Sequence, residues 1–123
     1  MPRITARFVE KPWGHEEIFA TTDAYVGKIL VLRAGEALSL QYHRTKDETI
    51  RVLEGEMDLV AGESLEDLAT HRLAAGDVFH VTPRTIHRMI AVTDCRILEV
   101  STPHLDDVVR LEDRYGREGT STA

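Results

Sequence analysis

The sequence predicts an all-β fold, an antiparallel sandwich or barrel that forms a single domain over residues 1–123. Short apolar runs alternate with turn signals along most of the chain, which is the rhythm of strands joined by short loops. A chain of 123 residues with 42% hydrophobic content can bury one core but has no room for a second domain. The acidic stretch 62–69 differs in character, and it is too short for an independent helix.

The expected strands follow from apolar runs that end at glycine, proline or a short polar segment. In chain order these runs are 25–33, 38–42, 49–53, 56–61, 77–82, 87–92 and 96–101. Gly55 lies between two of them, so the segment 53–57 predicts a tight hairpin. The stretch 62–69 is expected to be a solvated excursion.

The two ends of the chain differ from the central part. We expect an N-terminal arm at 1–20, a barrel at 21–105, a C-terminal segment at 106–118 and a frayed tail at 119–123. The arm carries four apolar anchors and should pack against the body or a neighbouring subunit: Phe8, Trp13, Ile18 and Phe19.

Composition excludes several classes of partner. The formal net charge of -6 argues against binding to nucleic acid or to an anionic membrane. No apolar run is long enough to span a bilayer, and the start of the chain lacks the apolar stretch of a signal peptide. Cys95 is the single cysteine, so a disulfide framework is excluded and we expect a cytoplasmic protein.

Four donor side chains have a spacing that favours a metal site: Gln41, His43, Glu48 and His87. Gln41 and His43 share a face of one strand, and a hairpin through 44–47 would bring Glu48 back beside His43. Two imidazoles, a carboxylate and an amide oxygen suit a divalent metal in open coordination. Zn is our first choice, with Fe, Mn, Ni or Co as alternatives.

These residues resemble the two sequence motifs of the cupins. Gly35, Gln41, His43, Glu48 and Gly55 match the first motif, with Gln41 in place of its usual first histidine. The resemblance implies a double-stranded β-helix, the cupin jelly roll, and an isologous homodimer.

The second cupin motif is matched at Gly76 and His87. Thr82, Arg84 and Ala91 replace its usual proline, glycine and asparagine, which affects the turn rather than the metal donors.

Within the cupins, the chain resembles the C-terminal domain of type II mannose-6-phosphate isomerase/mannose-1-phosphate guanylyltransferase. The segments 11–14, 38–43, 86–88 and 106–116 carry this resemblance. It implies a Gln, His, Glu, His metal site and sugar-phosphate chemistry. No glycine-rich nucleotide-binding segment precedes the cupin, so we expect a stand-alone relative.

An isomerase of this kind also needs a base and a cationic grip on the phosphate. We name Lys28, His80 and Arg88 as substrate-binding residues, and the sequence does not single out a catalytic base. Arg88 follows His87 on a strand and should face away from it, where it would pair with a carboxylate such as Glu99.

The C-terminal segment alternates apolar and charged residues. Val109 and Leu111 are expected to dock against the barrel, which would leave Arg110 and Glu112 solvated or bridging to a partner.

Three functions are compatible with this pattern. The first is a metal-dependent sugar-phosphate isomerase or epimerase that resembles mannose-6-phosphate isomerase and binds a sugar or sugar phosphate. The second is a metal-binding cupin that holds a sugar or another small molecule without turnover. The third is an iron-dependent dioxygenase.

Overall fold

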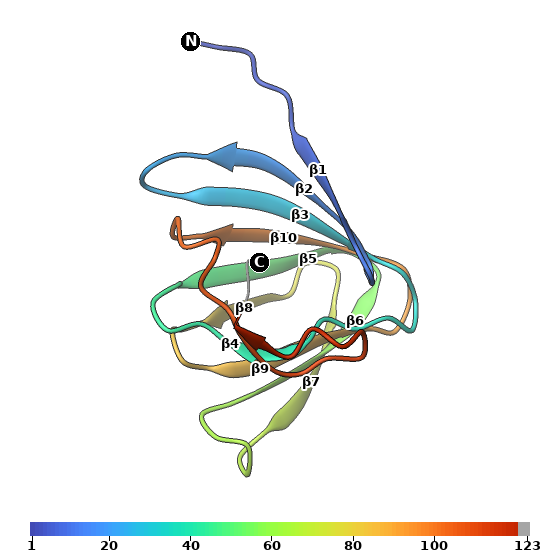
Figure 1. Ribbon diagram of the computed structural model, residues 1–123. Coiled ribbons are helices and arrows are strands. Elements are labelled where there is room, and N and C mark those ends of the chain that lie inside the picture. Colours follow the sequence, from blue (N-terminus) through green and yellow to red (C-terminus); the bar gives the residue numbers. More distant parts are fainter. Residues whose placement is uncertain (121–123) are drawn as a thin grey trace.

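The computed structural model describes residues 1–120, which form two antiparallel sheets stacked face to face as a jelly roll (Figure 1). The strands are β1 (Arg7–Lys11), β2 (Gly14–Thr21), β3 (Val26–Leu32), β4 (Leu40–Tyr42), β5 (Glu48–Glu54), β6 (Glu56–Gly62), β7 (Ala69–Ala74), β8 (Val78–Val81), β9 (Ile86–Ala91), β10 (Cys95–Ser101), β11 (Val109–Glu112) and β12 (Gly119–Thr120). One sheet has the order β1-β2-β3-β10-β5-β8 and the other has the order β12-β11-β4-β9-β6-β7. The predicted all-β jelly roll is confirmed.

The core lies between the sheets, where alternate residues of each strand point inward. Its most buried large side chains come from both sheets: Leu30, Leu32, Ile50, Met57, Leu59, Met89 and Ile97. Cys95 belongs to the same cluster, and burial together with nearby Asp94 raises the pKa of its thiol to about 11. The thiol is therefore protonated at neutral pH, as expected for an ordinary strand residue.

All seven predicted strands are present, with ends shifted by at most two residues. The N-terminal arm is not an appendage, because 7–11 and 14–21 form β1 and β2 of the first sheet. The apolar pattern of β2 is interrupted by Glu16, which points inward and is 5% exposed. This buried charge is why alternation did not reveal the strand.

The strands β7 and β12 were also not predicted. Along β7 only Leu73 is buried, so the segment carries no alternating pattern. β12 pairs with β11 through Arg110 and Gly119, so part of the expected frayed tail belongs to the sheet. Residues 121–123 of that tail lie outside the described residues. Of the stretch 62–69, the ends belong to β6 and β7, and residues 63–68 form the surface turns between these strands.

The predicted hairpin at Gly55 is wrong, because β5 and β6 belong to different sheets. Gly55 has a φ of 86°, and a Cβ there would lie 2.3 Å from the carbonyl oxygen of Asp94. The chain therefore turns a tight corner from one sheet to the other, close to the backbone that leads into β10. A glycine between two apolar runs is typical of a hairpin and of a corner between sheets alike, so the sequence does not distinguish the two.

Among the residues that the structure describes, no helix has the length and apolar character needed to cross a membrane.

Replacing Gly55 by alanine tests this corner. Gly35 is a matched control, because its φ is 83° and a Cβ there would meet nothing within 4 Å. We expect Gly35→Ala to cost about 1–2 kcal/mol of unfolding free energy from the left-handed backbone alone. Gly55→Ala should cost clearly more, because the new methyl group also collides with backbone. Urea unfolding measures both, and equal losses would contradict the corner geometry.

Candidate metal centre

Three of the predicted metal donors meet in the interior. His43 follows β4, Glu48 begins β5 and His87 lies on β9, and all three are buried. The Oε1 atom of Glu48 is 3.5 Å from the Nε2 atom of His43 and 3.3 Å from that of His87. One ligand atom from each residue lies within 4.8 Å of the others, which is close enough for a single ion to bind all three.

The jelly roll places these donors on facing sheets. β4 and β9 are neighbours in one sheet, with Gln41 opposite His87, whereas β5 belongs to the other sheet. The segment 44–47 is therefore a crossing between sheets and not the predicted hairpin. Glu48 still reaches His43, because both side chains point into the space between the sheets.

Hydrogen bonds orient both imidazoles. The Nδ1 atom of His43 is 2.5 Å from the carbonyl oxygen of Asp107, and that of His87 is 2.9 Å from the carbonyl oxygen of Thr85. A carbonyl can only accept, so each Nδ1 carries a hydrogen, and in the neutral imidazole each Nε2 then presents a lone pair. Neither Nε2 has a hydrogen-bond partner among the described residues.

Three electron-pair donors thus converge in a buried space, and a cation is the natural partner for them. Two imidazole nitrogens and one carboxylate oxygen match the ligand types of zinc and of other divalent transition metals. The donor set fits a divalent metal.

Gln41 lies on β4, two residues before His43, and it lines the adjoining pocket. Its Oε1 atom accepts a hydrogen bond of 2.6 Å from the hydroxyl of Ser39. A carbonyl oxygen has a second lone pair. Its role as a fourth ligand remains a prediction.

Lys46 holds the carboxylate of Glu48 in its charged form. Burial alone would raise the pKa of Glu48, but the ammonium group of Lys46 opposes this and holds that pKa well below its usual value. The Nζ atom of Lys46 is 3.0 Å from Glu48 and 3.0 Å from Glu99. Burial would lower the pKa of Lys46, yet these two carboxylates outweigh it and raise that pKa. The centre therefore contains an ionised carboxylate ready to bind metal.

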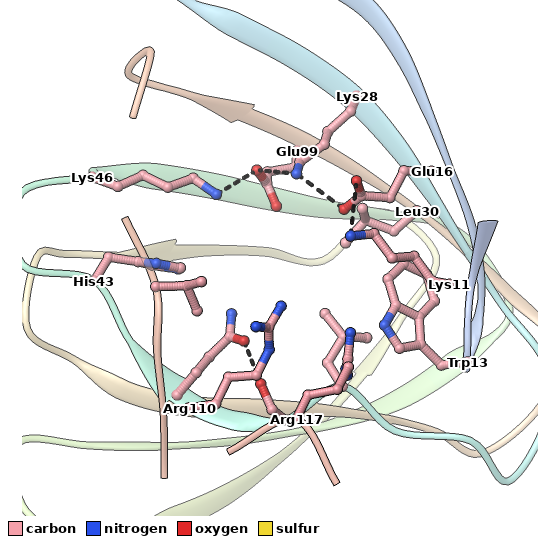
Figure 2. Close-up of a pocket in the computed structure, with 14 residues that line it drawn as sticks. Lys11, Trp13, Glu16, Lys28, Leu30, His43, Lys46, Glu99, Arg110 and Arg117 are labelled. Carbon is pink, nitrogen blue, oxygen red and sulfur yellow. Dashed lines mark hydrogen bonds and ion pairs between the residues drawn. The ribbon is translucent and has the colours of Figure 1, made fainter. Parts of the chain in front are cut away.

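A pocket beside the triad is rich in positive charge (Figure 2). Its wall contains five cationic side chains but two carboxylates: Lys11, Lys28, Lys46, Arg110, Arg117, Glu16 and Glu99. Figure 2 shows the lysines and glutamates along one side, Arg110 and Arg117 across from them, His43 at one end and Trp13 at the other. Two further carboxylates pair with these cations from behind the wall, Asp113 with Arg117 at 2.9 Å and Glu48 with Lys46 at 3.0 Å, so the pocket has a small excess of positive charge in an acidic chain.

One side of the pocket is a row of buried ion pairs. Lys28 lies 3.0 Å from Glu16 and 3.8 Å from Glu99, and Lys11 lies 4.0 Å from Glu16. Through Glu99 the row continues to Lys46 and so to the metal donors. The electrostatics of the pocket and of the metal centre are therefore linked.

One of the three predicted substrate-binding residues lines the pocket, and the other two lie outside it. Lys28 lines the pocket, but His80 and Arg88 do not. His80 is exposed and lies 2.6 Å from a carboxylate oxygen of Asp47. Arg88 donates to the side chain of Glu112 at 2.8 Å and to the carbonyl of Leu38 at 3.0 Å. It faces away from His87 as strand parity required, but its partner is Glu112 and not Glu99.

The C-terminal segment has the opposite orientation to the one expected. Arg110 is 6% exposed and lines the pocket, whereas Leu111 is 39% exposed. Apolar residues point inward only where the interior is apolar, and β11 borders a polar pocket. The only feature of the sequence that indicated a functional role for this segment was the resemblance of 106–116 to the isomerase branch of the cupins. Lys11, Trp13 and Glu16 are further pocket residues that the sequence analysis missed.

Comparison with known proteins agrees with this geometry. The family model described as "Cupin domain" matches residues 28–101, more than half of the chain, and the protein belongs to this family. The similarity to mannose-1-phosphate guanylyltransferase RfbM of Salmonella typhimurium is 27% identity over 113 residues, covering 88% of this chain and 22% of that protein. The chain thus spans less than a quarter of that relative.

Solved structures show the same fold. An RmlC-like cupin from Desulfovibrio desulfuricans superimposes with a TM-score of 0.62 at 28% identity, covering 79% of this chain and 83% of that one. Oxalate decarboxylase of Bacillus subtilis superimposes with a TM-score of 0.73 at 18% identity, covering 85% of this chain and 30% of that one. The second likeness concerns the fold alone.

Removal of either histidine tests the metal centre. His43→Ala and His87→Ala should each reduce bound metal sharply, because each variant loses one of few protein donors. His80→Ala is the control, since His80 is exposed and lies outside the pocket. Elemental mass spectrometry on protein purified without an affinity tag measures the occupancy. Unchanged occupancy in both triad variants would refute the site.

Proposed function

We propose that this protein is a metal-dependent cupin that acts on a sugar phosphate as an isomerase, with Zn as the first choice of metal. The observation that supports this most is the position of the donor triad beside a pocket whose wall includes His43 and carries a small excess of positive charge. A neutral sugar would not need such a pocket, whereas a phosphate monoester would. The similarity to a mannose-1-phosphate guanylyltransferase points to the same class of ligand.

Aldose-ketose isomerisation removes a proton from the carbon next to a carbonyl and returns one to the neighbouring carbon. A divalent metal bound by His43, Glu48 and His87 would supply a Lewis acid that stabilises negative charge on the substrate oxygens. Arg110 would hold the phosphate from one side of the pocket, and Lys28 would do so from the other. Trp13 and Leu30 would exclude water from the closed end.

A cupin that binds its ligand without turnover is the second candidate. It is favoured by the state of Glu16 and Glu99, the two carboxylates of the pocket wall, because both are held in ion pairs with lysines. A carboxylate held in such a pair is not free to turn toward a carbon of the substrate. Tight binding of a sugar phosphate without product would select this reading.

An iron-dependent dioxygenase is the third candidate. Two histidines and one carboxylate are the protein ligands that such enzymes use. Oxygen consumption by the iron-loaded protein would select this reading over the other two.

The isomerase proposal is tested by assaying the metal-loaded protein for conversion of mannose-6-phosphate to fructose-6-phosphate. Near-stoichiometric metal together with turnover that chelation abolishes is the expected result. Turnover that survives chelation would rule the proposal out.

Arg110 should matter for binding more than for folding. We expect Arg110→Met to raise KM for the sugar phosphate roughly 10- to 100-fold, the effect of losing a hydrogen bond to a charged group. Arg88→Met is the control, since Arg88 is an arginine that is paired with Glu112 and lies outside the pocket. Steady-state kinetics measures both variants. Equal effects would contradict a phosphate grip at Arg110.

We also propose a homodimer that forms through the edge strand β1. This strand has one neighbour in its sheet, and Phe8 on it is 63% exposed. Exposed sheet edges are commonly covered by another chain. Light scattering coupled to size-exclusion chromatography would measure the mass, and a monomer at micromolar concentration would oppose this assembly.

A further inference from the structure

One side chain from the C-terminal segment fixes the crossing that carries the metal donors. The carboxylate of Asp107 accepts hydrogen bonds from three consecutive backbone amides: those of Arg44 at 3.0 Å, Thr45 at 2.7 Å and Lys46 at 2.9 Å. The backbone carbonyl of the same residue accepts the Nδ1 hydrogen of His43 at 2.5 Å. A single residue therefore contacts both a metal donor and the backbone that follows it.

The side chains of Lys46 and Asp47 in this crossing are held by ion pairs, but its backbone amides have few other partners. The crossing passes from one sheet to the other, so no strand ladder pairs its amides. At one end of the crossing, the backbone amide of Arg84 donates a hydrogen bond of 2.6 Å to the carbonyl of His43. At the other end, the backbone amide of Asp47 donates one of 3.1 Å to the hydroxyl of Thr102. Between these ties, the three successive amides all point to Asp107. The angle at which the chain leaves His43 and reaches Glu48 thus depends on this carboxylate.

Asp107 is well suited to this task because it remains charged. Three backbone N–H groups point at this carboxylate, and such donors favour the charged form of the group. Hydrogen bonds to a charged acceptor are roughly twice as strong as those between neutral groups.

The same segment also forms part of the pocket wall. Val108 follows Asp107 directly and is 2% exposed, and Arg110 lies two residues further on β11. Both line the pocket. Docking of this short segment therefore places the pocket wall and fixes the metal-bearing crossing in one step.

We infer that Asp107 is a positioning residue that couples the geometry of the metal donors to the docking of the pocket wall formed by Val108 and Arg110. This inference rests on the proposed metal site but not on any particular reaction. Coupling between two equilibria is reciprocal, so metal binding must also tighten the docking of the segment.

The first experiment compares Asp107→Asn with the control Asp106→Asn, an exposed neighbour. Asparagine keeps the backbone carbonyl but presents a weaker, uncharged acceptor to the three amides. In the metal-free Asp107→Asn protein, hydrogen exchange should accelerate at residues 44–46 while β10 keeps its protection. Its zinc affinity, measured by competition with a chromophoric chelator, should fall about 10- to 100-fold, as for loss of an outer-shell contact. The Asp106→Asn variant should match the wild type in both.

Two outcomes would overturn the inference. Zinc affinity equal to that of the wild type despite fast exchange at 44–46 would show that the crossing does not position the donors. Loss of protection throughout the protein would reduce Asp107 to a general contributor to stability.

A second experiment uses the wild type alone, so it does not depend on a variant that folds. Saturating zinc should slow exchange at 44–46 and at the amides of β11, and unchanged exchange at β11 would overturn the coupling. A wild type that binds no zinc removes the metal centre and the coupling together. A wild type that binds zinc with the expected protection but turns over no sugar phosphate contradicts the isomerase and leaves the role of Asp107 standing.

Discussion

The pairing of buried charges is the constraint on which this structure depends. A row of ammonium and carboxylate groups runs between the sheets from Lys11 through Glu16, Lys28, Glu99 and Lys46 to Glu48. Removing ions from water is costly unless each finds a partner of opposite charge. Glu99 and Lys28 are direct partners in the register of β10 with β3. A shift of β10 by one residue would turn Glu99 to the other face of the sheet and leave Lys28 without this partner, so the charges reinforce one strand pairing over its alternatives.

The interior is divided into a polar end and an apolar end, and individual strands carry both. On β3, Lys28 precedes Leu30 and Leu32, and on β9, His87 precedes Met89. The antiparallel strand β10 runs the other way, from Ile97 to Glu99. The polar parts of these strands lie together at one end of the interior, and the apolar parts lie together at the other. A packed core therefore closes one end, and a pocket opens at the other. The donor triad lies at the polar end, where buried lone pairs and low solvent access favour a tightly held cation.

The C-terminal segment completes this polar end. It supplies Arg110 to the pocket, the carbonyl that orients His43, and the carboxylate that holds the crossing at 44–46. A jelly roll without this segment would lack one wall of the pocket and one support of the metal centre. The polar end is thus built from both ends of the chain, because Lys11 and Glu16 come from the first two strands.

The fold class, seven of the strands and the three donors that converge were predictable from the residues alone, because alternation and turn residues are local and the motif spacing is specific. Tertiary structure alone decided that the links at 44–47 and Gly55 cross between sheets, since turn chemistry does not state which strand follows in space. It also decided that Arg110 points inward while His80 and Arg88 lie outside the pocket. Parity separates the two faces of a strand, but it cannot tell which face is interior when the interior is itself charged. Asp107 was invisible for a related reason: its contacts join residues more than sixty positions apart, and no local pattern records them.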